Sequence, residues 1–181
     1  LETARNPYGF IGGIDAHCFD EMYLRQLAAE RDPEKAKQPR PFRLAVIQLD
    51  TYDGTLYNAR YVVDRIGHLC DYILFDSAWA GYEQFIPMLK EHVSPLLLDL
   101  EKTDPGIFVV QSVHKQQAGF SQTSQIHKKD VNIHDQPRYV NHKTINNAFM
   151  AQATTSPFYP LFATLDVNAK SMPRCRAQNV A

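Results

Sequence analysis

The sequence predicts an α/β fold built on a parallel sheet, and two patterns carry that prediction. Three short apolar runs suit strands buried inside such a sheet, and they cover residues 42–49, 72–75 and 107–110. Stretches with helical spacing of apolar residues separate these runs. Strands alternating with helices predict parallel pairing, with helices covering both faces of the sheet.

In chain order, the first feature is a turn-rich segment, Asn6–Ile14, which holds three glycines and a proline. A helix is expected over 19–30. The charged segment 31–41 contains three prolines and is expected to form an exposed connection. A second helix is expected over 57–69, because its apolar residues recur at helical spacing: Ala59, Val62, Val63, Ile66 and Leu69.

In the second half of the chain, helical stretches broken by two prolines are expected over 82–100. A polar stretch rich in Gln and Ser follows Lys115 and runs to about residue 130. His127 and His134 in this region are expected to be solvated. The last elements expected are two helices, over 146–155 and 158–170.

Composition excludes several classes of protein. The chain has 181 residues, of which 44% are apolar, and 19 basic residues against 20 acidic ones leave a net charge of −1. This balance predicts no affinity for nucleic acid. No apolar run approaches the roughly 18 residues that span a bilayer, so no membrane association is expected. The three cysteines form no C-x-x-C pair and favour a reducing cytoplasm.

Polar residues follow each of the three predicted strands, over 50–54, 76–79 and 111–115. Because ligands collect at the carboxyl ends of parallel strands, Asp76 and Lys115 can face one pocket. A lysine and an aspartate converging there suit a cationic aromatic cofactor, which the amine binds covalently while the carboxylate holds a ring proton.

Each of these signals also has a structural interpretation. A lone lysine after a strand is usually solvated, and Asp76 could cap the helix that follows it. Ser112 and His114 could hydrogen-bond within their own loop, and no G-x-S-x-G motif supports a hydrolase. The spacing of Asp15, His17 and Cys18 matches no common zinc pattern, so no metal site is expected.

The segment VQSVHKQQAGFSQTS, Val110–Ser124, resembles the pyridoxal-phosphate attachment signature of the bacterial ornithine, lysine and arginine decarboxylases. Residues 70–88 resemble the segment of that family that contacts the cofactor nitrogen, and residues 146–170 resemble its continuation after the lysine. The pair Gln116 and Gln117 is similar to the ornithine branch. Asp50 departs from the family, where a glycine is more typical.

The resemblance implies a fold and its boundaries. It places the chain in the major domain of a pyridoxal-phosphate-dependent transferase-like (fold type I) protein, of which only part is present. Residues 1–170 would be the central and C-terminal part of the cofactor domain, and residues 171–181 a divergent tail. The sequence opens without a methionine, and we interpret it as an internal fragment.

The resemblance also implies roles for individual residues. Lys115 would carry the cofactor, Asp76 would keep its pyridine nitrogen protonated, and His114 would join them in the catalytic set. The implied cofactor-binding residues are Lys115, Asp76, Ala78 beside the ring, Ser112 and His114 near the phosphate, and Thr154 reaching the neighbouring subunit's site. Trp79 could equally line the pocket or pack in the core.

The implied activity is decarboxylation of L-ornithine to putrescine and carbon dioxide by a cytoplasmic homodimer or larger homo-oligomer, in polyamine biosynthesis or acid response. Two alternatives stay open. The substrate could be lysine or arginine, or the chain could be a truncated remnant without catalysis. Because the resemblance covers only the middle of the family's length, the isolated chain is expected to be inactive.

Overall fold

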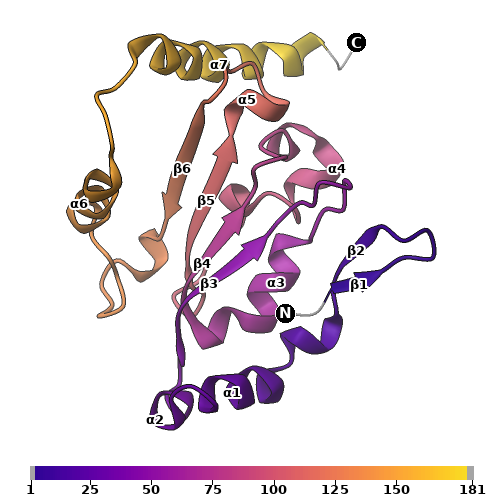
Figure 1. Cartoon of the computed structure of the whole chain (residues 1–181), viewed down its shortest axis with the longest axis vertical. Helices are drawn as coiled ribbons and strands as arrows, with labels where there is room; N and C mark the ends of the chain where they lie inside the picture. The colour runs from indigo at the N-terminus through magenta and orange to yellow at the C-terminus, as the bar shows by residue number, and fades with distance from the viewer. Residues whose placement is uncertain (1–2, 179–181) are drawn as a thin grey trace.

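The computed structural model describes residues 3–178, and residues 173–178 as backbone alone (Figure 1). A separate antiparallel hairpin comes first, formed by β1 (Thr3–Arg5) and β2 (Ile11–Ile14). The main sheet has the strand order β3, β4, β5, β6. The bounds of these strands are Phe42–Gln48, Cys70–Asp76, Gly106–Ser112 and Ser124–Lys129.

Helices precede, connect and follow the strands. Those before the sheet are η1 (Ala16–Phe19), α1 (Glu21–Ala29) and α2 (Pro33–Ala36). Those between strands are α3 (Ala59–Ile66), η2 (Gly67–Leu69), η3 (Glu83–Phe85), α4 (Pro87–Lys90) and η4 (Pro95–Leu97). The remaining ones are α5 (Val113–Gln116), η5 (Val131–Ile133), α6 (His142–Gln152) and α7 (Tyr159–Gln178).

The expected helices are present, with shifted ends. The stretch 82–100 divides into single turns because Pro87 and Pro95 each begin a new helix, the position that proline favours. Helix α6 begins four residues before the expected start, where the Asn141 side chain accepts a hydrogen bond from the Thr144 amide at 2.9 Å. Helix α7 continues past its expected end at residue 170.

The predicted parallel sheet is confirmed for β3, β4 and β5, with Gln48 opposite Asp76 and Asp76 opposite Val110. Strand β6 was not expected, and it pairs antiparallel with β5. Its sequence, SQIHKK, holds a single apolar residue, so only the pairing partner makes it a strand. The expectation that His127 is solvated is wrong: the side chain is half-buried, and burial lowers its pKa.

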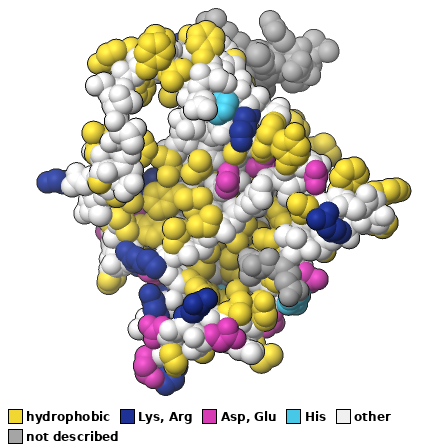
Figure 2. Space-filling view, in the orientation of Figure 1, with side chains coloured by type: hydrophobic (Ala, Val, Ile, Leu, Met, Phe, Trp, Pro, Cys, Tyr) yellow, Lys and Arg dark blue, Asp and Glu magenta, His cyan; other side chains and the backbone are white. Residues whose placement is uncertain are grey.

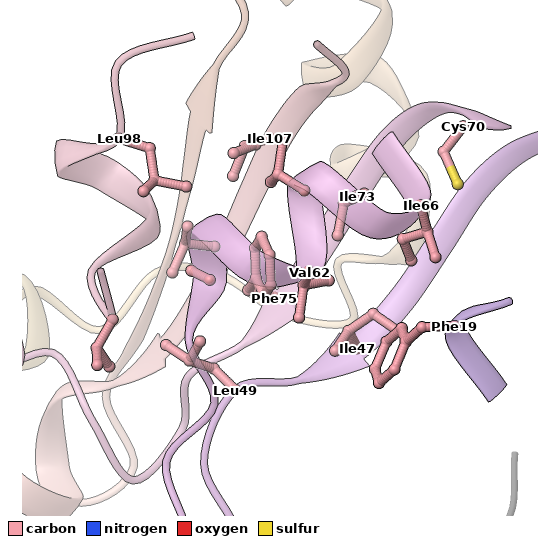
Figure 3. Packing of buried hydrophobic residues seen from close by; sticks show 14 of the residues in the cluster. Phe19, Ile47, Leu49, Val62, Ile66, Cys70, Ile73, Phe75, Leu98 and Ile107 are labelled. Carbon is pink, nitrogen blue, oxygen red and sulfur yellow. The ribbon is translucent and has the colours of Figure 1, made fainter. Parts of the chain in front are cut away.

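The main core lies on one face of the sheet, against α3 (Figure 3). Because side chains alternate along a strand, Ile73 and Phe75 share the face that packs against this helix. The α3 residues that complete the contact are Val62, Val63 and Ile66. Burial of each such side chain stabilises the fold by roughly 1.5–3 kcal/mol, which holds the carboxyl ends of the strands in register.

The opposite face of the sheet is only partly covered, and Figure 2 shows hydrophobic side chains gathered over the strands in this view. Leu44, Val46 and Ile126 are 45%, 63% and 47% exposed. The expectation of a fully buried first strand is therefore wrong, and helices cover the second face of the sheet only in part among the described residues. Strand β3 lies at the edge of the sheet, and an apolar run alone does not determine what covers it.

A smaller apolar cluster covers part of this second face, over β4 and β5. It is formed by Tyr72, Phe108 and Ile133, with Ile145 of α6 packed against it. The Tyr72 hydroxyl donates to Asp130 Oδ2 at 2.9 Å. Helix α6 lies beyond β6, and α7 crosses the carboxyl end of the sheet near α5 (Figure 1).

Candidate functional site

The polar segments that follow β3, β4 and β5 meet at one edge of the sheet. The backbone joins them there: the Leu49 amide donates to the Asp76 carbonyl and the Ser77 amide donates to the Val110 carbonyl, both at 2.8 Å. Asp50 stands two residues beyond the end of β3, and Lys115 lies in the single turn α5 that continues directly from β5. Parallel pairing therefore gathers groups that are far apart in sequence.

The exposed side chain of Lys115 lies over the ring of Trp79. Its Nζ lies 4.8 Å from the centroid of the Trp79 ring, which suits a cation–π contact. Trp79 in turn meets the ring of Tyr52 edge-on, with 5.2 Å between their centroids. Trp79 thus contacts the Lys115 amine directly, and Tyr52, from the turn after β3, supports it.

Asp76 ends β4 with a half-buried carboxylate. Its Oδ1 accepts a hydrogen bond from the Ala78 amide at 3.1 Å, which closes a local turn. The residues that follow form a turn, and the next helical element is η3, so Asp76 caps this turn and not a helix. Ala78, also half-buried, is fixed by the same bond.

Asp50 is a buried acid at the same edge, only 3% exposed. Its pKa is raised from 3.8 to about 6, chiefly by burial. The negative charges of Asp76 and Glu83 raise the pKa further. The Trp79 backbone and the positive charge of Lys115 lower it. These effects place Asp50 within electrostatic reach of both Asp76 and Lys115. Among the described residues, neither Asp50 oxygen has a partner with normal hydrogen-bond geometry.

Further polar groups that were not singled out from the sequence are buried around this edge. Glu83 is fully buried, its Oε2 accepts from the Gly81 amide, and burial raises its pKa. Ser77 Oγ and Gln111 Nε2 are buried without a hydrogen-bond partner in the described part of the chain. Unpaired buried polar atoms are costly, which is typical of a site that a ligand or water completes. Ser77 and Gln111 could have been found from their places at the strand ends, whereas no local signal marks Glu83.

His114 is tied to the segment that precedes β6. Its Nδ1 lies 2.8 Å from the Thr123 carbonyl oxygen and 3.1 Å from the Thr123 amide nitrogen, so it bonds one or the other according to tautomer. The His114 amide donates to the same carbonyl at 3.2 Å. Ser112 stands opposite Ser124 in the ladder, directly before α5. The imidazole thus fastens the loop, and Nε2 is the nitrogen that these contacts leave for another role.

Thr154 is exposed, in the connection between α6 and α7 that runs along the outer side of the molecule (Figure 1). The structure does not bring it together with the groups above. Within the described residues, no three His, Cys, Asp or Glu side chains are arranged to hold a metal ion. No helix of that part of the chain is long and apolar enough to cross a bilayer.

The fold and this edge together define part of an α/β domain with a lysine–carboxylate site at the ends of its parallel strands. The family model described as "Orn/Lys/Arg decarboxylase, major domain" matches residues 1–180. The chain therefore belongs to the Orn/Lys/Arg decarboxylase family. The family and the partial α/β domain expected from the sequence are both confirmed.

Individual relatives locate the chain within that family. It is 78% identical to ornithine decarboxylase of Haemophilus influenzae over 170 residues, which are 94% of the chain and 24% of the relative. It is 77% identical to inducible ornithine decarboxylase of Escherichia coli, over 94% of the chain and 23% of the relative. Identity to biodegradative arginine decarboxylase of E. coli is 32%, over 95% of the chain and 22% of the relative.

Solved structures agree with this placement. Lysine decarboxylase A from Pseudomonas aeruginosa superimposes with a TM-score of 0.79 at 30% identity, over 94% of this chain and 22% of that chain. The constitutive lysine decarboxylase of E. coli gives a TM-score of 0.75 at 32% identity, over 93% of this chain and 21% of that one. The chain thus spans about a quarter of the length of the ornithine decarboxylases it matches.

Proposed function

We propose that this chain is the cofactor-carrying part of a pyridoxal-phosphate-dependent ornithine decarboxylase, which converts L-ornithine to putrescine and carbon dioxide. The observation that carries the proposal is that parallel pairing of β3, β4 and β5 brings Asp50, Asp76 and Lys115 to one edge of the sheet. Identity of 77–78% to ornithine decarboxylases, against 32% to an arginine decarboxylase, favours ornithine as the substrate.

The residues at this edge fit pyridoxal phosphate. An exposed primary amine, Lys115, and a half-buried carboxylate, Asp76, both lie within electrostatic reach of the buried acid Asp50. Neither oxygen of Asp50 has a hydrogen-bond partner with normal geometry among the described residues. When bound, the cofactor supplies an electron-accepting ring for the electron pair that departing carbon dioxide leaves on Cα.

In this proposal, Lys115 binds the cofactor covalently through its amine and releases it to the substrate. Asp76 holds a proton on the pyridine nitrogen, and the hydrogen bond that its Oδ1 accepts from the Ala78 amide fixes the orientation of its carboxylate. Trp79 holds the Lys115 amine against its ring face. His114 belongs to the catalytic set through its Nε2.

Orientation of the cofactor is assigned to the remaining residues. Ala78 leaves room beside the ring because its side chain is a single methyl group. Ser112 and His114, on either side of the strand-to-helix turn at Val113, are proposed to hold the phosphate. The His114 contact with Thr123 fixes the turn from which both project.

The complete protein is proposed to be a cytoplasmic homodimer or larger assembly acting in polyamine biosynthesis or acid response, with Thr154 reaching a neighbouring subunit's site. In support, Thr154 lies in an exposed connection between helices whose outward faces are apolar. The side chains of Phe149, Phe158 and Phe162 are 63%, 64% and 55% exposed. Exposed apolar surface of this kind is typical of a surface that contacts another protein.

A chimeric enzyme tests this function. Residues 1–170 replace the matching segment of the E. coli inducible ornithine decarboxylase, and carbon dioxide release is measured from ornithine, lysine and arginine in parallel. We expect release from ornithine and loss of it in Lys115→Arg, with the wild-type E. coli enzyme as the control. A folded chimera that binds pyridoxal phosphate but releases nothing would instead favour the remnant, and preference for lysine or arginine would overturn the substrate.

A further inference from the structure

Helix α7 is mostly exposed in its described part, but it buries two polar residues on one side. Thr164 and Asn168, one turn apart, are 7% and 5% exposed. The helix crosses the carboxyl end of the sheet and lies against η3, the turn that follows the Asp76 segment (Figure 1). Thr164 satisfies its own hydroxyl by donating to the Leu161 carbonyl at 2.9 Å. Asn168 is therefore the group that reaches outside the helix.

The Asn168 side-chain amide makes two hydrogen bonds to the loop after Lys115, one as donor and one as acceptor. Its Nδ2 donates to Gln117 Oε1 at 2.7 Å, and its Oδ1 accepts from the Ala118 amide at 3.1 Å. The loop needs such an anchor because α5 is a single turn with no side-chain cap bond among the described residues. Lys115 itself is exposed and does not anchor the turn by burial.

Gln117 extends the connection toward Asp76. A Cβ placed on Gly81 would lie only 2.1 Å from Gln117 Nε2, so the Gln117 amide occupies space that a side chain at Gly81 would fill. Gly81 belongs to the loop that starts at Asp76, and its amide donates to Glu83. One glutamine thus touches both the helix α7 and the loop after Asp76.

We propose that Asn168 and Gln117 are positioning residues that hold the Lys115 loop against the Asp76 loop and so set the spacing between the amine and the carboxylate. Neither is given a chemical step. The proposal rests on the proposed function in one respect, that Lys115 and Asp76 grip the same cofactor. The mechanical link is independent of that function and can be measured without the cofactor.

The link is tested first by amide hydrogen exchange on the full 181-residue chain without cofactor. Asn168→Leu is close in size and removes both hydrogen bonds. We expect exchange at the Ala118 amide to rise roughly threefold to tenfold, the range set by the loss of one net hydrogen bond. Asn147→Leu, on the exposed surface of α6, is the matched control and should leave that rate unchanged. Equal rates in wild type and Asn168→Leu would overturn the link.

The positioning role is tested by trapping. Each variant is titrated with pyridoxal phosphate, reduced with borohydride and peptide-mapped for label on Lys115, well below its thermal midpoint. We expect Asn168→Leu and Gln117→Leu each to raise the half-maximal cofactor concentration several-fold. The double variant should be no worse than either single one, because both changes remove one shared connection. Additive effects, or a lowered thermal midpoint with unchanged labelling, would show a merely structural role.

A milder variant protects the test against loss of folding. Asn168→Asp keeps the acceptor for the Ala118 amide but removes the donor to Gln117, so exchange at Ala118 should stay slow while labelling of Lys115 weakens. Failure of wild type to label at Lys115 would count against the proposed function, and the hydrogen-exchange result would still decide the link. If wild type and all variants are labelled with the same half-maximal cofactor concentration, the positioning role is refuted, and the proposed function is not.

Discussion

Replacing Asp50 with asparagine should stabilise the fold at neutral pH. The buried carboxyl has a pKa of about 6 in the folded chain, against an ordinary value of 3.8. Between these pH values the folded state binds more protons at this site than the unfolded state, so stability falls as pH rises. At about 1.36 kcal/mol per pH unit, the full difference is roughly 3 kcal/mol, lost between pH 3.8 and 6 and constant above.

Asp50→Asn removes that cost while keeping the size of the side chain. Urea unfolding followed by far-ultraviolet circular dichroism should show the variant more stable than wild type at pH 7.5, by up to about 3 kcal/mol. The advantage should shrink on acidification and vanish below about pH 4. Asn147→Leu, on the exposed surface of α6, changes no titratable group and is the control; it should leave the pH dependence of stability as in wild type. A variant less stable than wild type at pH 7.5, or an advantage independent of pH, would refute the reasoning.

Three further predictions address the site, the core and the open face. Trp79→Leu should remove the cation–π contact with the Lys115 amine, which is worth about 0.5–2 kcal/mol. An amine reagent should then modify Lys115 faster, and an unchanged rate would contradict the contact. Phe75→Ala, at a fully buried position, should cost about 3–5 kcal/mol in urea unfolding, and a cost under about 1 kcal/mol would contradict the described core. Leu44→Lys combined with Val46→Lys should reduce self-association in sedimentation while leaving the thermal midpoint nearly unchanged, whereas a large drop in midpoint would mean that this face is buried.

Much of the fold follows from local patterns. The apolar runs of β4 and β5 and the helical spacing of α3 are local signals, and together they determine parallel pairing. Parallel pairing in turn brings the residues after each strand to one edge, so the position of Asp76 and Lys115 at the same edge of the sheet could be predicted from the sequence. The sequence signature around Lys115 pointed to the same family as the comparisons.

The tertiary structure alone decided what these patterns leave open. Strand β6 exists because β5 offers it a partner, and its own polar sequence carries no strand signal. The burial of Asp50 and the bonds from Asn168 to the Lys115 loop depend on residues that meet only after the chain has folded. Local sequence predicts most of the elements, because propensity and periodicity act over a few residues. Contacts between distant segments are set by packing, and these contacts made β6 a strand and buried Asp50.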